Sequence, residues 1–397
     1  MVVLVLISCK KEHKEGVSAR EDTFLAKVDS TLKIAEKQYE FLSEQVSLGE
    51  YPKTYHSATD SLETSGSDWW CSGFYPGTMI YLNEVNPSQK LQSKTKDVLE
   101  DLKKEQFNRS THDLGFMMYC SFGNAERLHK SPEYEDILMN SAQSLATRYN
   151  DTVKAIRSWN SAPWNKAGDD DLVVIIDNMM NLELLFWATK FSQDSTFYNI
   201  AVNHANTTMK HHFRPDYSSY HEVIYDEKTG DVKAQITNQG AADSSSWARG
   251  QAWGLYGYTV AYRETKDKNY LEQAKHIADY LLNHPNLPQN KISYWDFNAP
   301  HIPDALRDSS AAAIMASALI ELSAYTEGTI AKEYLSNAKT ILENLMSPKY
   351  FANVGDNGGF LLKHGVGNMP NNTEIDTPLS YGDYYFVEAM IRYINLK

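Results

Sequence analysis

Two kinds of predicted helix alternate along the chain. Six segments carry apolar residues at helical spacing on one side only, and these amphipathic segments are residues 23–45, 87–107, 134–149, 196–212, 270–282 and 330–346. Six others are apolar on nearly every side, and they are residues 75–84, 111–127, 177–191, 246–265, 308–325 and 383–394. Strict alternation of this kind is a repeat signal. We therefore predict an all-α fold, an (α/α)6 barrel in which six inner helices are shielded by six outer ones, in a single domain from residue 23 to residue 397.

The third inner segment contains one acid in otherwise apolar sequence. Residues 173–176 are a β-branched run that makes a poor helix interior, whereas residues 179–189 are good helix formers, so the helix should begin near Asp177. Asn181 then lies on the same face as Asp177, and apolar side chains cover the remaining circumference. Asp177 is either an N-cap, for which Asp is a preferred residue, or a carboxylate presented to a cavity.

Long polar loops precede several inner segments, at residues 158–171, 215–246 and 351–380. In an (α/α)6 barrel, loops that precede inner helices all emerge at one end. Acidic residues fall at or near the starts of five inner segments, at Asp68, Asp113, Asp177, Asp308 and Asp383. Helix capping explains Asp at most of these positions, but the geometry still gathers several acids around one mouth. The second loop also carries the pattern of a β-hairpin at residues 218–236.

Composition narrows the choice of partners and cofactors. The formal net charge of −13 argues against nucleic acid as a partner. The chain has 25 Tyr and 8 Trp, which serve as stacking platforms in carbohydrate sites, although core packing is their commoner use. Three Cys are too few for a disulfide framework, and the sequence has no zinc-ligand spacing, phosphate-binding loop or Ser nucleophile elbow. We expect neither a metal nor a cofactor.

The first nine residues, MVVLVLISC, are too short to span a bilayer. Their ending, Leu6 to Cys9, followed by the charged stretch KKEHKEG, resembles the lipobox of a bacterial lipoprotein, in which the Cys is acylated and becomes the mature N-terminus. We therefore expect residues 1–22 to be a lipoprotein-type signal and charged linker outside the fold. This predicts a periplasmic protein that meets the membrane only through a lipid anchor at Cys9.

Four short motifs lie in order along the chain. They are DWWCSGFYPG at residues 68–77, HDLGF at 112–116, IDNMMNL at 176–182 and WARGQAWG at 247–254. Together they resemble glycoside hydrolase family 88, the unsaturated glucuronyl hydrolases, from the first inner helix to the C-terminus. The resemblance implies the same barrel that the helix pattern predicts. The related unsaturated rhamnogalacturonyl hydrolases share this barrel, so the resemblance fixes the substrate less closely than the fold.

The resemblance also implies roles for individual residues. It makes Asp177 the general acid and base and Asp113 its partner. Residues that match family positions around an unsaturated uronate are His221, Gln239, Trp247 and Arg249. Trp70 corresponds to a stacking Trp, with Trp69 as the alternative, and His112 is a neighbour without an assigned role. From the residues alone, an internal salt bridge is the more ordinary interpretation for Arg249, and a place in the core is the more ordinary one for Trp247.

The chemistry implied is hydration of an enol ether. The substrate would be a short oligosaccharide from a polysaccharide lyase that ends in a 4,5-unsaturated uronate. Protonation at C4 creates an oxocarbenium ion at C5, water adds there, and the hemiketal opens and releases the next sugar. One acid can perform both proton transfers, so the carboxylate-spacing rule of ordinary glycosidases does not apply. Asp177 must start protonated, so apolar surroundings and the charge of Asp113 must raise its pKa.

Two other functions remain open at this stage. One is a barrel glycosidase or epimerase that acts on saturated sugars, which release of a keto acid would exclude. The other is a lipid-anchored, non-catalytic glycan-binding barrel. The pair Asp113 and Asp177 argues against a protein that only binds glycans, because two carboxylates facing an acidic sugar do not strengthen its binding.

Overall fold

The computed structural model describes residues 5–162 and 165–396, and it contains twelve α-helices within those ranges. The six outer helices are α1 (Val5–Gln45), α3 (Gln89–Leu102), α5 (Pro132–Ala146), α7 (Ser195–His211), α9 (Lys268–Asn283) and α11 (Gly328–Leu345). Four of the inner positions are single α-helices: α2 (Phe74–Val85), α8 (Ala248–Thr265), α10 (Ser309–Ser323) and α12 (Ser380–Asn395). The second inner position is a π-helix, η2 (Gly115–Gly123), continued by α4 (Asn124–Leu128). The third is a 3-10 helix, η3 (Ile176–Asn181), continued by α6 (Leu182–Ser192).

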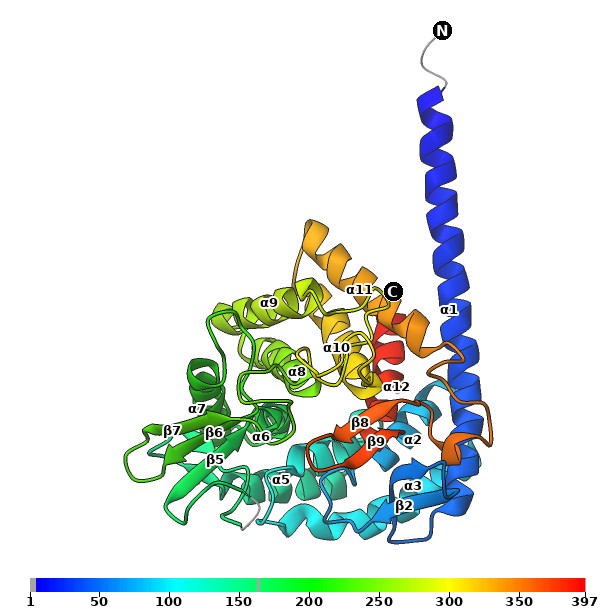
Figure 1. Cartoon of the computed structure of the whole chain (residues 1–397). Helices are drawn as coiled ribbons and strands as arrows, with labels where there is room; N and C mark the ends of the chain where they lie inside the picture. The colour runs from blue at the N-terminus through cyan, green and yellow to red at the C-terminus, as the bar shows by residue number, and fades with distance from the viewer. Residues whose placement is uncertain (1–4, 163–164, 397) are drawn as a thin grey trace.

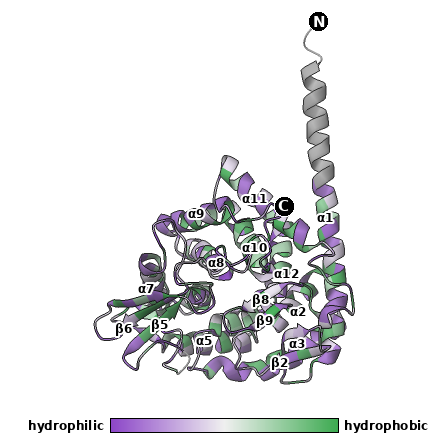
Figure 2. Ribbon diagram, in the orientation of Figure 1, coloured by the Kyte–Doolittle hydropathy of each residue, from purple (hydrophilic) through white to green (hydrophobic). Residues whose placement is uncertain are grey.

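The inner helices close a ring. In chain order α2 contacts η2, η2 contacts α6, η3 contacts α8, α8 contacts α10, α10 contacts α12, and α12 returns to contact α2. Each outer helix packs against a neighbouring inner one, and Figure 1 shows this arrangement around the barrel. In Figure 2 the outer helices α9 and α11 carry both hydrophilic and hydrophobic residues, as amphipathic helices should. The predicted (α/α)6 barrel is confirmed.

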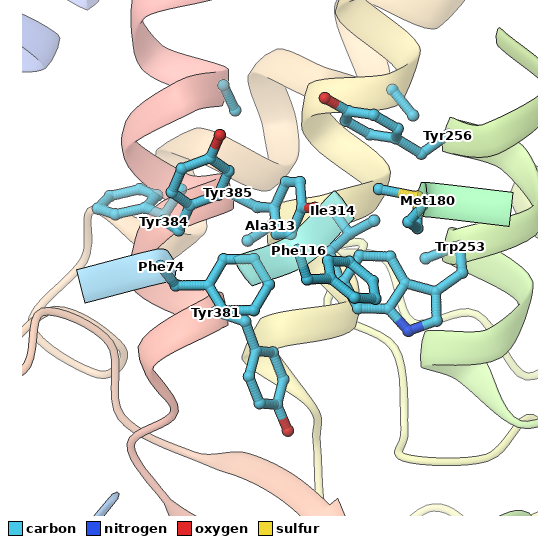
Figure 3. Close-up of a cluster of buried hydrophobic side chains, with 14 of the residues drawn as sticks. Phe74, Phe116, Met180, Trp253, Tyr256, Ala313, Ile314, Tyr381, Tyr384 and Tyr385 are labelled. Atoms are coloured by element: carbon cyan, nitrogen blue, oxygen red, sulfur yellow. The ribbon is translucent and has the colours of Figure 1, made fainter. Parts of the chain in front are cut away.

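Aromatic side chains from the inner helices fill the barrel core. Figure 3 shows side chains from all six inner positions in one cluster. The ring of Phe116 lies 5.4 Å from that of Phe74 and 5.1 Å from that of Trp253, and Trp253 lies 5.3 Å from Tyr385. Glycine permits the closest approach, because a Cβ at Gly115 would lie 2.4 Å from the Cα of Asn181. This contact fixes the start of η2 against η3, the two segments that carry the predicted acids.

Small sheets in the connecting loops were only partly predicted. The expected hairpin is present as β6 (Glu222–Asp226) and β7 (Val232–Ile236), but β5 (Asp171–Ile175) adds a third strand, antiparallel to β6. Two further hairpins are β1 (Tyr51–His56) with β2 (Ser61–Ser65), and β8 (Gly365–Asn368) with β9 (Thr373–Thr377). The two-residue strands β3 (Tyr149–Asn150) and β4 (Ala155–Ile156), and the 3-10 helices η1 (Lys103–Phe107) and η4 (Asn357–Gly359), complete the elements.

The first helix is longer than the sequence pattern predicts. Helix α1 begins at Val5 and not near residue 23, and Figure 1 shows its N-terminal part extending away from the barrel. Its buried face includes Phe24, Val28 and Leu32. Residues 1–4 of the expected signal segment lie outside the described residues, and Cys9 falls in a part of α1 whose side chains are not described. The boundary at residue 22 therefore stays a prediction. No helix among the described residues is long and apolar enough to cross a membrane.

Candidate active site

A cavity lies where the loops before the inner helices meet. It is lined by Trp70, His112, Asp113, Phe116, Trp159, Ile175, Asp177, Gln239 and Arg249. Six of the eight residues predicted for the site are in this lining. The other two, His221 and Trp247, are buried directly behind it, where the ring of His221 lies 4.7 Å from that of Trp247. The structure thus brings all eight predicted residues together.

Asp177 faces this cavity and does not cap a helix. The helical segment η3 has Ile175 in the N-cap position, with extended backbone angles and no side-chain cap hydrogen bond. Strand β5 ends at that same residue, so Asp177 enters the first turn directly from the sheet. Its Oδ2 is buried and has no hydrogen-bond partner within the described structure. The capping interpretation is wrong, and the cavity interpretation describes the geometry.

The surroundings of Asp177 favour its protonated form. Burial raises the pKa of Asp177 to about 7; Arg249 acts against this rise and the charge of Asp113 adds to it. A carboxyl group with such a pKa can donate a proton near neutral pH. An acid with a pKa near neutrality is also well placed to take the proton back.

Asp113 is a second buried acid in the same cavity. Thr111 Oγ1 donates to its Oδ2 over 3.1 Å, and His112 Nε2 lies 3.2 Å from its Oδ1. Burial raises the pKa of Asp113 to about 7, partly offset by Thr111 and Arg148. Burial also lowers the pKa of His112 to about 3, and Arg148 lowers it further, so this imidazole is neutral at neutral pH. Asp113 therefore has no cationic histidine beside it.

His221 presents a donor to Asp177. The backbone N–H groups of Asn238 and Gln239 both point at His221 Nδ1, at 3.0 and 3.3 Å, so this nitrogen is an acceptor. Burial lowers the pKa of His221 to about 3, with a further contribution from Arg249, so the neutral ring carries its proton on Nε2. That nitrogen lies 3.6 Å from Asp177 Oδ2. The β6–β7 hairpin and the loop after it thus fix the tautomer of the histidine beside the acid.

Arg249 has an internal role as well as a place in the cavity wall. Its Nη1 donates to Asp308 Oδ2 at 3.1 Å and to the Val366 carbonyl at 2.6 Å, and its Nη2 donates to the Gly367 carbonyl at 2.6 Å. The guanidinium also lies 4.5 Å from the centre of the Trp247 ring. The salt-bridge alternative for Arg249 and the core alternative for Trp247 therefore both hold. Arg249 ties the β8–β9 hairpin to the start of α10 while one of its sides faces the cavity.

The two neighbouring tryptophans take different positions. Trp70 lines the cavity and packs 4.9 Å from the ring of Tyr381 and 5.5 Å from that of Phe116. Trp69 is 44% exposed and lies outside the lining. Trp70 is therefore the candidate for stacking on a sugar inside the cavity.

Sequence reasoning missed Trp159 and Asp308 as site residues. Trp159 lines the cavity, and its ring lies 5.8 Å from that of His221. The only signal was an aromatic residue within the polar loop 158–171, because none of the four motifs contains it. Asp308 was expected at a helix start, and it does cap α10, but its Oδ2 also holds Arg249. That second role depends on a contact across the barrel that no local pattern shows.

Comparisons with known proteins agree with this site and fold. The model of Glycosyl Hydrolase Family 88 matches residues 46–395. An unsaturated glucuronyl hydrolase from Formosa agariphila is 45% identical over 98% of this chain and 95% of its own length. An unsaturated chondroitin disaccharide hydrolase from Streptococcus pyogenes is 30% identical over 96% of this chain and 93% of its own. The crystal structure of an unsaturated glucuronyl hydrolase specific for heparin superposes with a TM-score of 0.89 at 42% identity, over 94% of this chain and 98% of that one.

A barrel of this kind with these relatives is a glycoside hydrolase. The chain belongs to glycosyl hydrolase family 88. The family resemblance inferred from the four motifs is therefore confirmed. The roles of the individual site residues stay predictions, supported by the geometry described above.

Proposed function

We propose that this chain removes the 4,5-unsaturated uronate from the non-reducing end of lyase-generated oligosaccharides by hydrating the C4=C5 double bond. The observation that carries the proposal is that the carboxyl group of Asp177 does not cap a helix. It is buried, faces the cavity, and has its pKa raised to about 7 by burial and by Asp113. A group of this kind is partly protonated at neutral pH, and its protonated form can deliver a proton to carbon.

The reaction needs one proton donor and one water. Asp177 gives its proton to C4, and the C5 cation that forms is stabilised by the ring oxygen. Water then bonds to C5 and returns a proton to the Asp177 carboxylate, which restores the acid. The C5 hemiketal opens to a ketone, leaving a hemiacetal at C1, and this hemiacetal releases the neighbouring sugar. The balance is one water consumed for one glycosidic bond broken.

The neighbouring side chains support these steps from fixed positions. Asp113 keeps the pKa of Asp177 high by its charge. His221 places an N–H beside Asp177 Oδ2, where it stabilises the carboxylate that forms after proton transfer. Arg249 supplies positive charge toward the substrate carboxylate, and Trp70 offers a ring face in the cavity wall. Gln239 and His112 complete the wall and offer polar groups to the sugar hydroxyls or the water.

The substrates we propose are unsaturated glycosaminoglycan disaccharides. Relatives across nearly the whole chain are named for heparin and for chondroitin disaccharides, which favours this class over unsaturated rhamnogalacturonides. The test is to incubate the protein with unsaturated disaccharides of heparin and of chondroitin. Loss of the absorbance of the conjugated double bond, together with a new keto acid, is expected from the native chain and not from Asp177→Asn. An intact double bond with every disaccharide would contradict the proposal, and cleavage of saturated glycosides without a keto acid would favour an ordinary glycosidase.

We also propose that Cys9 carries a lipid anchor that holds the barrel in the periplasm. The support is the sequence Leu6-Ile7-Ser8-Cys9 with the charged residues that follow it. Expressed in a bacterial host with labelled fatty acid, the native chain should incorporate label and Cys9→Ala should not. Equal labelling of the two proteins would contradict the anchor without affecting the proposed reaction.

A further inference from the structure

Two hairpins form part of the rim outside the cavity. Strand β1 contacts strand β9, so the β1–β2 and β8–β9 hairpins lie side by side. The β8–β9 hairpin is bound to Arg249 through the carbonyls of Val366 and Gly367. The rim formed by these two hairpins is therefore continuous with the cavity wall.

Trp69 lies on this rim and is 44% exposed. It precedes Trp70, which lines the cavity, so one of these two consecutive rings lies inside the cavity and the other on the rim outside it. The ammonium of Lys53, on β1, lies 5.3 Å from the centre of the Trp69 ring. A large exposed aromatic residue directly beside a binding cavity is a surface on which a sugar ring can stack.

Lys53 is held in place by two acids. Its Nζ lies 2.6 Å from Glu63 Oε1 and 3.8 Å from Glu374 Oε1, and its side chain is 19% exposed. Burial acts to lower the pKa of Lys53, but the two glutamates outweigh it and the pKa lies above its ordinary value. The ammonium is therefore a fixed positive charge beside the exposed ring.

An anionic ligand can reach Lys53 without leaving its partners unsatisfied. Glu63 Oε2 lies 2.7 Å from His56 Nε2, and the Glu63 side chain is 38% exposed, so Glu63 keeps a partner and access to water if a ligand shares the ammonium. Burial raises the pKa of Glu374, and the charges of Lys53 and Arg249 act against this rise, so both cations lie within electrostatic range of Glu374. Glu374 thus interacts both with Arg249 of the cavity wall and with Lys53, which lies beside the Trp69 ring.

We propose that Trp69 and Lys53 form a further sugar subsite, which takes the third residue of an unsaturated oligosaccharide. This rests on the proposed function, in which the unsaturated uronate is the first residue in the cavity and the released sugar is the second. In a glycosaminoglycan, uronates alternate with amino sugars, so the third residue is again a uronate with a carboxylate. Trp69 stacks on its ring, and Lys53 binds its carboxylate. Disaccharides do not reach this subsite.

The test compares an unsaturated tetrasaccharide with its disaccharide. In Trp69→Ala and in Lys53→Gln, kcat/KM for the tetrasaccharide should fall about tenfold through KM, the order expected for losing one stacking or charged contact. The value for the disaccharide should stay within about twofold in both variants. Phe191→Ala is the matched control, because Phe191 is also a large exposed aromatic residue, 47% exposed, but lies at the end of α6, away from the mouth. This variant should leave kcat/KM unchanged for both substrates.

Three further measurements make the outcome decisive. Trp69→Phe, which keeps a ring, should recover much of the tetrasaccharide kcat/KM, and this separates stacking from a folding defect. A tetrasaccharide whose third residue has its carboxyl group reduced to an alcohol should no longer distinguish native protein from Lys53→Gln. Equal losses on both substrates, or no loss on either, would overturn the subsite while native turnover of the disaccharide leaves the proposed function standing. Native protein that turns over neither substrate would contradict the function itself.

Discussion

The two ends of the barrel bury acidic side chains among different partners. At the mouth, neither Asp113 nor Asp177 forms an ion pair with Lys or Arg among the described residues, and the histidines beside them are neutral. Toward the C-terminal ends of the inner helices lies a larger cavity, of about 670 Å3, where acids and bases are paired. Arg263 Nη1 lies 3.0 Å from Glu321 Oε1, and Arg392 Nη1 lies 2.7 Å from Glu321 Oε2.

The comparison shows that the partner, and not burial alone, decides what a buried acid can do. Burial acts to raise the pKa of Glu321, but Arg392 and Arg263 outweigh it, and its pKa lies below the ordinary value. Burial also raises the pKa of Asp177, and there Arg249 offsets only part of the rise. Glu321 therefore stays ionised within its ion pairs, while Asp177 can hold and give a proton. The larger cavity lies at the end with paired charges, and the smaller one is where we propose that the reaction takes place.

Asp177→Asn is expected to have the largest effect, because it removes the proton donor. Turnover of an unsaturated disaccharide should fall by about 10⁴-fold, the upper range for a general acid and base. The amide keeps the shape of the side chain, so substrate should still bind and the unfolding midpoint should not fall. The measurements are loss of the double-bond absorbance, substrate binding by calorimetry, and thermal unfolding. Near-native rates would remove Asp177 from the mechanism.

Arg263→Met should reverse this pattern at the other end of the barrel. It breaks contacts with Glu183, Glu264 and Glu321. Glu321 keeps Arg392 and Glu264 keeps Lys190, but Glu183 loses its ion pair. The free energy of unfolding should drop by about 3 kcal/mol, as expected when one member of a buried ion pair is removed. Denaturant unfolding measures the loss, and kcat below the unfolding transition should stay close to native. A variant of native stability that has lost its activity would break the distinction between the two ends.

Asp113→Asn should have a smaller effect on rate, together with a change in pH dependence. Activity requires protonated Asp177, so it is lost as the pH rises through the pKa of that group. The charge of Asp113 raises the pKa of Asp177, so removing the charge lowers it and moves the loss of activity to lower pH. We expect kcat at neutral pH to fall about 10- to 100-fold. A pH–rate profile checks the sign, and a profile of unchanged shape would assign Asp113 a purely structural role.

The barrel could be predicted because its signal is local and repeated. Each inner helix is apolar on nearly all sides within its own sequence, and the alternation with amphipathic helices needs no knowledge of contacts. Strand β5 was missed because its partner β6 lies about fifty residues further along the chain, so residues 173–176 showed only that a helix was disfavoured.

The sequence predicted which residues form the candidate site better than it predicted the hydrogen bonds and ion pairs that hold them in place. The four motifs point to Asp113, Asp177 and Arg249, but whether Asp177 caps a helix depends on the backbone at Ile175, which the pairing of β5 fixes. The bonds from Arg249 to Asp308 and to the β8–β9 hairpin join segments far apart in sequence. Contacts of this kind arise from packing around the ring and leave no periodic pattern.

Turnover in heavy-oxygen water tests the central claim most directly. If Asp177 protonates C4 and water then adds at C5, the label should appear at the C5 carbonyl of the uronate product at early times, before exchange with solvent. C1 of the uronate should carry no label at these early times, because no water attacks the anomeric carbon of the broken bond. Label at C1 of a uronate that keeps its double bond would mean direct hydrolysis of the glycosidic bond and would contradict hydration.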